Sequence, residues 1–178
     1  RPKLIYVIPN FQNPSGRTWS LPRRRRLAAL AVERGVPVIE DNPYGEIRFE
    51  GEHLPAIASL PGAGTVISLG TFSKVFCPGM RLAWVAAERE LLARLVVLKQ
   101  GADLHTSTLD QMILAEYLAS HDLDANIRRV AGAFGVGRPV EAAEEGHHGA
   151  AEHDVVEMGD DEVGVMEVDV GGEGAEEQ

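Results

Sequence analysis

Short apolar runs alternate with amphipathic segments over about the first 130 residues of the chain. The runs are rich in Val, Ile and Leu, are short enough for buried strands, and span residues 4–8, 36–40, 65–69 and 82–86. Apolar positions recur at helical spacing over residues 23–34, 88–100, 109–120 and 123–130, and a short helix could form over 56–60. This alternation predicts an α/β fold, a three-layer structure whose sheet is mostly parallel.

The first long helix has start and stop signals at its two ends. Ser20 is a candidate N-cap, Pro22 suits the first turn, and Gly35 suits the C-terminal cap. The positions predicted to face the core are Leu27, Leu30 and Ala31. The four arginines Arg23–Arg26 resemble a nucleic-acid-binding patch, but on the first turns of an amphipathic helix we expect them to form a solvated face.

Composition divides the 178 residues into two regions. The chain is 44% hydrophobic and has a net charge of −10. Residues 1–131 hold 16 Lys and Arg against 13 Asp and Glu, whereas residues 132–178 hold one Arg and 14 acidic residues, with no Leu or Ile. The second region cannot bury enough apolar surface to offset the entropy of ordering. We therefore predict a folded domain over 1–131 and, over 132–178, an acidic Gly-rich tail that is disordered or frameshifted.

Several classes of protein are disfavoured by composition. No apolar run reaches the roughly 18 residues of a membrane span, and the single Cys77 cannot form an internal disulfide. The amino terminus lacks a secretory signal, so we expect a cytoplasmic location. The acidic charge argues against a nucleic-acid partner. The histidines of the acidic region, His147, His148 and His153, are not expected to bind a metal.

Polar side chains follow three of the predicted strands. The turns span residues 9–16, 41–44 and 70–74, and ligands of open α/β sheets bind beyond the carboxyl ends of their strands. Arg81 instead precedes a strand, only seven residues after Lys74. A parallel return needs about a dozen residues or more, so we predict that this last strand is antiparallel and brings Arg81 to the same edge.

The predicted edge offers an amine, a carboxylate, a phenol, an amide, two hydroxyls and a guanidinium. This set suits a small, phosphorylated, electron-withdrawing cofactor, and pyridoxal 5′-phosphate fits each group. The groups belong to Lys74, Asp41, Tyr44, Asn13, Thr71, Ser73 and Arg81.

Four motifs in this order resemble those of fold-type I, class I/II aminotransferases. They are Asn13-Pro14-Ser15-Gly16, Asp41-x-x-Tyr44, Ser73-Lys74 and Pro78-Gly79-x-Arg81. The resemblance runs from about Leu4 to Arg129 and is strongest to the branch that contains 2-aminoadipate aminotransferases and the aminotransferase-like domains of MocR-type regulators. It implies the major domain of a pyridoxal-phosphate-dependent transferase, in part, with one antiparallel strand in its sheet.

The resemblance also implies the catalytic residues. Lys74 would bind the cofactor as a Schiff base and then act as the general base that moves the substrate Cα proton. Asp41 would pair with the pyridine nitrogen and keep it protonated, so that the ring accepts electrons.

The remaining site residues would bind the cofactor. Asn13 and Tyr44 would donate hydrogen bonds to its phenolate oxygen. Thr71, Ser73 and Arg81 would hold its phosphate, for which the forked guanidinium is well suited.

Each residue also has a simpler interpretation. Lys74 could be a solvated surface charge and Arg81 a structural ion-pair residue. Asp41 and Asn13 could belong to a cap or a turn. Tyr44 could be a core aromatic whose hydroxyl has a partner, and the hydroxyls at positions 71 and 73 could serve only the turn.

Three functional hypotheses remain open. In the first, the chain is part of an aminotransferase whose parent, a homodimer, exchanges an amino group between an L-amino acid and a 2-oxo acid. In the second, it belongs to the effector-sensing domain of a MocR-type regulator that binds the cofactor without needing turnover. In the third, it is an inactive gene fragment. The chain begins without Met and lacks a counterpart of the family's amino-terminal half, so we expect it to hold an incomplete site.

Overall fold

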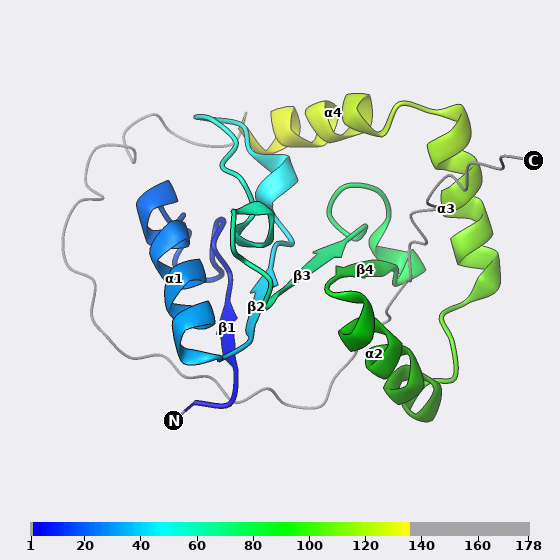
Figure 1. Cartoon of the computed structure of the whole chain (residues 1–178). Helices are drawn as coiled ribbons and strands as arrows, with labels where there is room; N and C mark the ends of the chain where they lie inside the picture. Colours follow the sequence, from blue (N-terminus) through cyan, green and yellow to red (C-terminus); the bar gives the residue numbers. More distant parts are fainter. Residues whose placement is uncertain (1, 136–178) are drawn as a thin grey trace, which may run out of the picture.

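A four-stranded mixed sheet forms the centre of the molecule. The computed structural model describes residues 2–135. The strands are β1 (Ile5–Val7), β2 (Val38–Asp41), β3 (Val66–Thr71) and β4 (Ala83–Ala86), in the order β1-β2-β3-β4 (Figure 1). The first three are parallel and β4 is antiparallel to β3. The predicted mostly parallel α/β sheet with one antiparallel strand is therefore confirmed.

Within residues 2–135, four α-helices and three short 3₁₀ helices connect and follow the strands. They are α1 (Leu21–Arg34), α2 (Arg89–Ala102), α3 (Thr108–Ser120), α4 (Leu123–Gly135), η1 (Gly45–Ile47), η2 (Ile57–Ser59) and η3 (Pro78–Met80). Each predicted helix is present, with ends that differ by one to a few residues. Helix α4 continues through Gly132, where the change in composition begins, and residues 136–178 lie outside the described part of the chain.

The sheet has one face that is buried and one that is half-buried. Val38 and Glu40 of β2 are buried, whereas the intervening Ile39 and the following Asp41 are half-buried. Because side chains alternate along a strand, burial on every second residue means that helices cover one face. The core cluster on that face comprises Val7, Ala28, Ala31, Val38, Ile57, Leu60, Ala63 and Val66.

Helix α1 packs on the sheet through a stripe that differs from the predicted one. Ala31 is buried as expected, but Leu30 is 38% exposed, and the fully buried large side chain of α1 is Arg24. The expectation that Arg23–Arg26 form a solvated face is therefore wrong at Arg24. Gly35 ends the helix in the left-handed conformation (φ 56°), as predicted, whereas the side chain of Ser20 makes no capping hydrogen bond.

A second cluster lies where the strands end. It comprises Ile47, Phe72, Val75, Leu82 and Leu114, with Tyr44, Trp84 and Ile127 packed against it. Gly70 pairs with Trp84 across β3 and β4, and an added Cβ would clash with the indole ring, which explains a glycine inside this strand.

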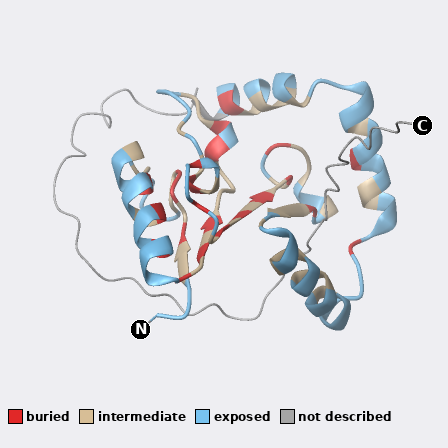
Figure 2. Cartoon of the chain, in the orientation of Figure 1, coloured by how far each residue is buried: buried red, intermediate tan, exposed pale blue. Residues whose placement is uncertain are grey.

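Figure 2 shows that α2 and α3 are exposed over most of their surface.

Candidate functional site

The carboxyl ends of β2 and β3 and the amino end of β4 meet at one edge of the sheet. Asp41 is the last residue of β2 and pairs with Leu69, and Thr71, the last residue of β3, pairs with Ala83. Arg81 stands two residues before β4, so the antiparallel strand brings it to the edge that Asp41 and Thr71 occupy, as predicted.

Lys74 and Tyr44 come together beside this edge. The turn after β3 carries the exposed Lys74, and Tyr44 precedes η1 in the segment that follows β2. The Lys74 Nζ lies 5.8 Å from the centroid of the Tyr44 ring, within the range of a cation–π contact. Tyr44 is half-buried against the second core cluster. The ring is thus fixed by packing, while the lysine amine is open to solvent.

The two hydroxyls of the predicted phosphate group have different surroundings. The Thr71 hydroxyl accepts a hydrogen bond from the Ser73 backbone N–H at 3.1 Å and donates to the Leu82 carbonyl at 3.4 Å. This is the turn interaction that the simpler interpretation of Thr71 predicts. The Ser73 side chain is half-buried and makes no hydrogen bond within residues 2–135.

Arg81 ends the turn between β3 and β4 in a left-handed conformation. Its φ is 55°, it caps η3, and its Nη1 donates to the Pro78 carbonyl at 3.2 Å. The side chain is exposed. A non-glycine residue with positive φ is uncommon, and here it turns the chain into β4.

Asn13 lies on the turn that follows β1, at the end where the parallel β2 also finishes. The turn is closed by the Gln12 N–H donating to the Arg17 carbonyl at 3.0 Å, and the Asn13–Pro14 peptide bond is cis. Asn13 is exposed. In the part of the chain that the structure describes, its side chain makes no hydrogen bond to the other six candidate residues.

Tyr6 contacts the site although the sequence analysis did not include it. Its hydroxyl donates to Oδ2 of Asp41 at 2.5 Å. Burial raises the pKa of Tyr6 above its usual value, and the hydrogen bond and the charge of Asp41 raise it further. The signal in the sequence was a tyrosine within the otherwise apolar run 4–8, whose hydroxyl needs a partner.

Buried Arg24 ties the turn after β1 to its surroundings. Its Nη2 donates to the Pro9 carbonyl at 3.0 Å and to the Asn10 Oδ1 at 2.6 Å. Its Nε and Nη1 donate to the carbonyls of Trp19 at 3.1 Å and Pro55 at 3.0 Å. The guanidinium therefore crosslinks three segments of the chain that have no regular structure.

The same network reaches the residue next to Asp41. Asn10 Nδ2 donates to Asn42 Oδ1 at 2.8 Å. The residue before Asp41 is the buried Glu40. Its carboxylate accepts hydrogen bonds from the backbone N–H groups of Ile57 at 2.8 Å and Ala58 at 3.0 Å, at the start of η2. Burial lowers the pKa of Arg24, and the charge of Glu40 partly offsets this effect.

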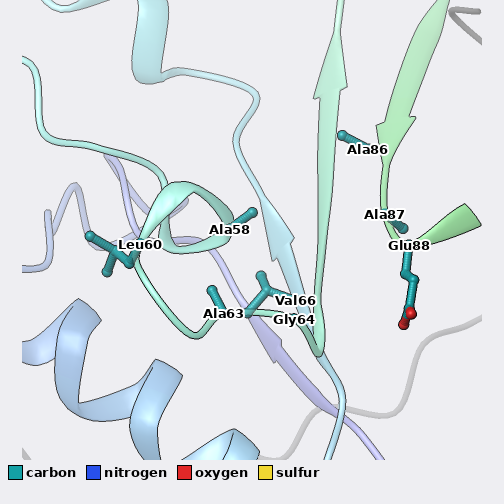
Figure 3. A pocket seen from close by; sticks show the side chains of 8 residues that line it. All are labelled: Ala58, Leu60, Ala63, Gly64, Val66, Ala86, Ala87 and Glu88. Carbon is teal, nitrogen blue, oxygen red and sulfur yellow. The ribbon is translucent and has the colours of Figure 1, made fainter. Parts of the chain in front are cut away.

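A hollow of about 540 Å³ lies at the opposite edge of the sheet. Figure 3 shows its lining residues, which are Ala58, Leu60, Ala63, Gly64, Val66, Ala86, Ala87 and Glu88. Val66 begins β3 and Ala86 ends β4, so this hollow is separated from the candidate residues by the length of the strands. It is lined mainly by small apolar side chains and does not contain the predicted site.

Residues 2–135 contain no group of three His, Cys, Asp or Glu side chains that could hold a metal ion. The histidines of the acidic region lie outside the described residues. No described helix is both long enough and apolar enough to cross a membrane.

The structure is that of an α/β protein with a mixed sheet. A lysine, a carboxylate and an arginine lie at the edge where β2 and β3 end and β4 begins. A family model described as aminotransferase class I and II matches residues 2–132. The chain therefore belongs to the class I and II aminotransferase family.

The relatives of the chain include a transaminase and a transcriptional regulator. Over 121 residues the chain is 48% identical to the 2-aminoadipate transaminase of Thermus thermophilus, covering 66% of this chain and 30% of that protein. Over 117 residues it is 35% identical to an uncharacterized HTH-type transcriptional regulator of Bacillus subtilis, YisV, covering 66% of this chain and 24% of the regulator.

A solved structure supports the same fold. The alpha-aminoadipate aminotransferase LysN of Thermus thermophilus, complexed with N-(5′-phosphopyridoxyl)-L-leucine, matches with a TM-score of 0.70 and 44% identity. The match covers 74% of this chain and 34% of that one. The chain thus spans between 24% and 34% of the length of these three proteins.

Replacing Arg24 by Met should destabilise the fold through the turn after β1. The substitution removes the donor of the buried Asn10 Oδ1 and of the Trp19 and Pro55 carbonyls, whereas the Pro9 carbonyl keeps the hydrogen bond from the Trp19 N–H. A buried unsatisfied group costs about 1–3 kcal/mol. We expect the free energy of unfolding, measured by urea denaturation, to fall by about 3 kcal/mol. The matched control is R25M, at an exposed position of the same helix turn, which should change it by less than about 0.5 kcal/mol. Equal losses in the two variants would contradict the structural role of Arg24.

Proposed function

We propose that this chain forms the part of an aminotransferase major domain that binds pyridoxal 5′-phosphate, and that its parent transfers an amino group between an L-amino acid and a 2-oxo acid. The observation that carries the proposal is the sheet edge. Asp41, Lys74 and Arg81 all lie at this edge, in a chain of the class I and II aminotransferase family. The phosphopyridoxyl-leucine bound by the solved Thermus relative supports the choice of cofactor.

The residues present fit the chemical groups of this cofactor. The exposed Lys74 amine is available to the aldehyde carbon. Within residues 2–135 only Oδ2 of the Asp41 carboxylate has a hydrogen-bond partner, so Oδ1 can accept from a protonated ring nitrogen. The exposed guanidinium of Arg81 suits a phosphate dianion.

The proposed division of labour follows from these groups. When bound, pyridoxal phosphate supplies a conjugated ring that accepts electrons from the substrate Cα. Lys74 would hold the cofactor covalently until the substrate amine displaces it, and the released lysine amine would then move the Cα proton. Asp41 keeps a proton on the ring nitrogen by presenting its negative charge there.

The other residues of the site orient the ring and the phosphate. Asn13 and Tyr44 are the donors proposed for the phenolate oxygen, and Tyr44 is already fixed by packing beside Lys74. Thr71, Ser73 and Arg81 are proposed to bind the phosphate, the first through a hydroxyl that also closes its own turn. Asn13 would have to approach from the turn after β1, where its side chain is exposed.

The cellular setting is part of the same proposal. We expect the parent to be a cytoplasmic homodimer that works in amino-acid metabolism, in a biosynthetic process. Its partners would be amino acids and 2-oxo acids, and we do not expect this chain itself to bind nucleic acid or a membrane.

An alternative is the cofactor-binding effector domain of a MocR-type regulator. The 35% identity to the Bacillus regulator favours it specifically. Such a domain would bind the cofactor with the same residues and would not need turnover. A winged helix-turn-helix segment encoded upstream in the same gene would support this alternative, and an inactive gene fragment would lack both activities.

Lys74 should be the lysine that captures the cofactor. The chain has only three lysines, Lys3, Lys74 and Lys99, and Lys99 is paired with Asp103 at 2.6 Å. After incubation with pyridoxal phosphate and reduction with borohydride, peptide mass spectrometry should find the added mass on Lys74. K74R should abolish the label and K99R should leave it in place. A label spread evenly over the three lysines would contradict the assignment.

Amino transfer by the 178-residue chain alone should be slow. Much of the rate of such a reaction comes from orienting the substrate against the cofactor, and the chain spans about a third of the length of the Thermus transaminase. We expect transfer from L-amino acids to 2-oxoglutarate at least about tenfold below that of the Thermus enzyme, measured by release of the 2-oxo acid product.

Turnover within tenfold of that enzyme would contradict this expectation and show that the 178-residue chain suffices for substrate binding. An assay of the complete gene product that carries this sequence distinguishes the aminotransferase from the regulator. Amino transfer by that product supports the enzyme, whereas cofactor binding without transfer supports the regulator.

A further inference from the structure

Tyr6 and Asp41 are brought together by the pairing of the first two strands. Tyr6 on β1 pairs with Ile39 of β2. Asp41 stands two residues after Ile39 on the same strand, so the side chains of Tyr6 and Asp41 project from the same face of the sheet. The 2.5 Å separation of the Tyr6 hydroxyl from Oδ2 is at the short end for a hydroxyl that donates to a carboxylate. The contact thus joins two paired strands and does not depend on a loop.

The hydrogen bond uses one oxygen of the carboxylate and leaves the other available. Asp41 is half-buried at the end of β2, and within residues 2–135 its side chain has no hydrogen-bond partner besides Tyr6. An aspartate carboxylate can rotate about two torsions, and fixing Oδ2 restricts the direction in which Oδ1 points. A carboxylate that is already oriented binds a further donor with less loss of conformational entropy.

We propose that Tyr6 is a positioning residue, whose hydroxyl fixes the carboxylate of Asp41 so that its second oxygen is presented to the ring nitrogen of the cofactor. This inference rests on the proposed function, because it assumes that Asp41 is the partner of that nitrogen. Tyr6 itself does not touch the cofactor in this arrangement. Its effect is transmitted through Asp41.

The competing interpretation is that Tyr6 only fills the sheet face. A phenylalanine would then serve equally well, since Tyr6 pairs with the apolar Ile39 on the half-buried face of the sheet. Two observations favour the hydroxyl. It contacts a charged group instead of solvent, and burial together with this contact raises the pKa of Tyr6, which favours the neutral phenol as donor. Y6F keeps the ring and removes only this donor.

The hydrogen bond can be tested in the chain without cofactor. Tyrosinate absorbance is followed against pH in the wild type and in Y6F, and the difference between the two curves gives the titration of Tyr6. We expect its midpoint to lie above the ordinary tyrosine value of about 10. In D41N, compared with the double variant Y6F/D41N, the midpoint should move down toward that value. A midpoint at the ordinary value, or one that D41N leaves unchanged, would overturn the contact.

The positioning role is tested with two ligands that differ only at the ring nitrogen. Pyridoxal phosphate has this nitrogen, whereas 1-deazapyridoxal phosphate has a C–H group in its place. Y6F should weaken the equilibrium binding of pyridoxal phosphate about tenfold, equivalent to about 1.4 kcal/mol, and should change the binding of the deaza analogue less than about twofold. Y117F, which alters a tyrosine on α3, serves as the control and should leave both affinities unchanged.

The outcomes distinguish this inference from the proposed function. Equal weakening of both ligands by Y6F, or no weakening of either, would overturn the positioning role while leaving the cofactor site intact. Failure of the wild-type chain to bind pyridoxal phosphate at all would overturn the proposed function and, with it, the role of Tyr6. Selective weakening of pyridoxal phosphate supports both.

Discussion

The antiparallel pairing of β4 with β3 is the constraint on which the candidate site depends. Thr71 at the end of β3 pairs with Ala83 at the start of β4, so the connecting turn must place Lys74 and Arg81 at the same edge. Because β2 runs parallel to β3, Asp41 ends there as well. Backbone hydrogen bonds thus set the position of three charged side chains that are up to 40 residues apart in the sequence.

Two buried charged residues, Arg24 and Glu40, stabilise the irregular segments next to the sheet. Arg24 is fully buried on α1 and binds the backbone of the segments that contain Pro9, Trp19 and Pro55. A buried guanidinium is stable only when its donors are used, and the nearby Glu40 supplies the compensating charge. Through Asn10 and Asn42 this network adjoins the residue that follows Asp41. The fold therefore supports the site from the face that α1 covers, while Tyr6 contacts Asp41 from the other face.

The sequence predicted the elements and the direction of β4 because these depend on local patterns. Short apolar runs, the glycine after α1 and the length of the loop before Arg81 are each readable over a few residues. The burial of Arg24 was not readable, because its four acceptors come from separate segments that meet only in the folded chain. Leu30 is exposed for a related reason, since the stripe that faces the core is centred on Arg24 and Ala28. The Tyr6–Asp41 contact likewise depends on strand register, which periodicity does not specify.

The central claim is that pyridoxal phosphate binds at the edge where β2 and β3 end and β4 begins. Amide NMR spectra of the ¹⁵N-labelled chain, recorded with and without pyridoxal phosphate, test this claim most directly. The account predicts shifts in the amides of residues 42, 44, 45, 71–77 and 79–81, with the amides of Ala63, Gly64 and Ala87 at the opposite edge unchanged. Shifts that concentrate at that opposite hollow, or spectra that do not change, would contradict it.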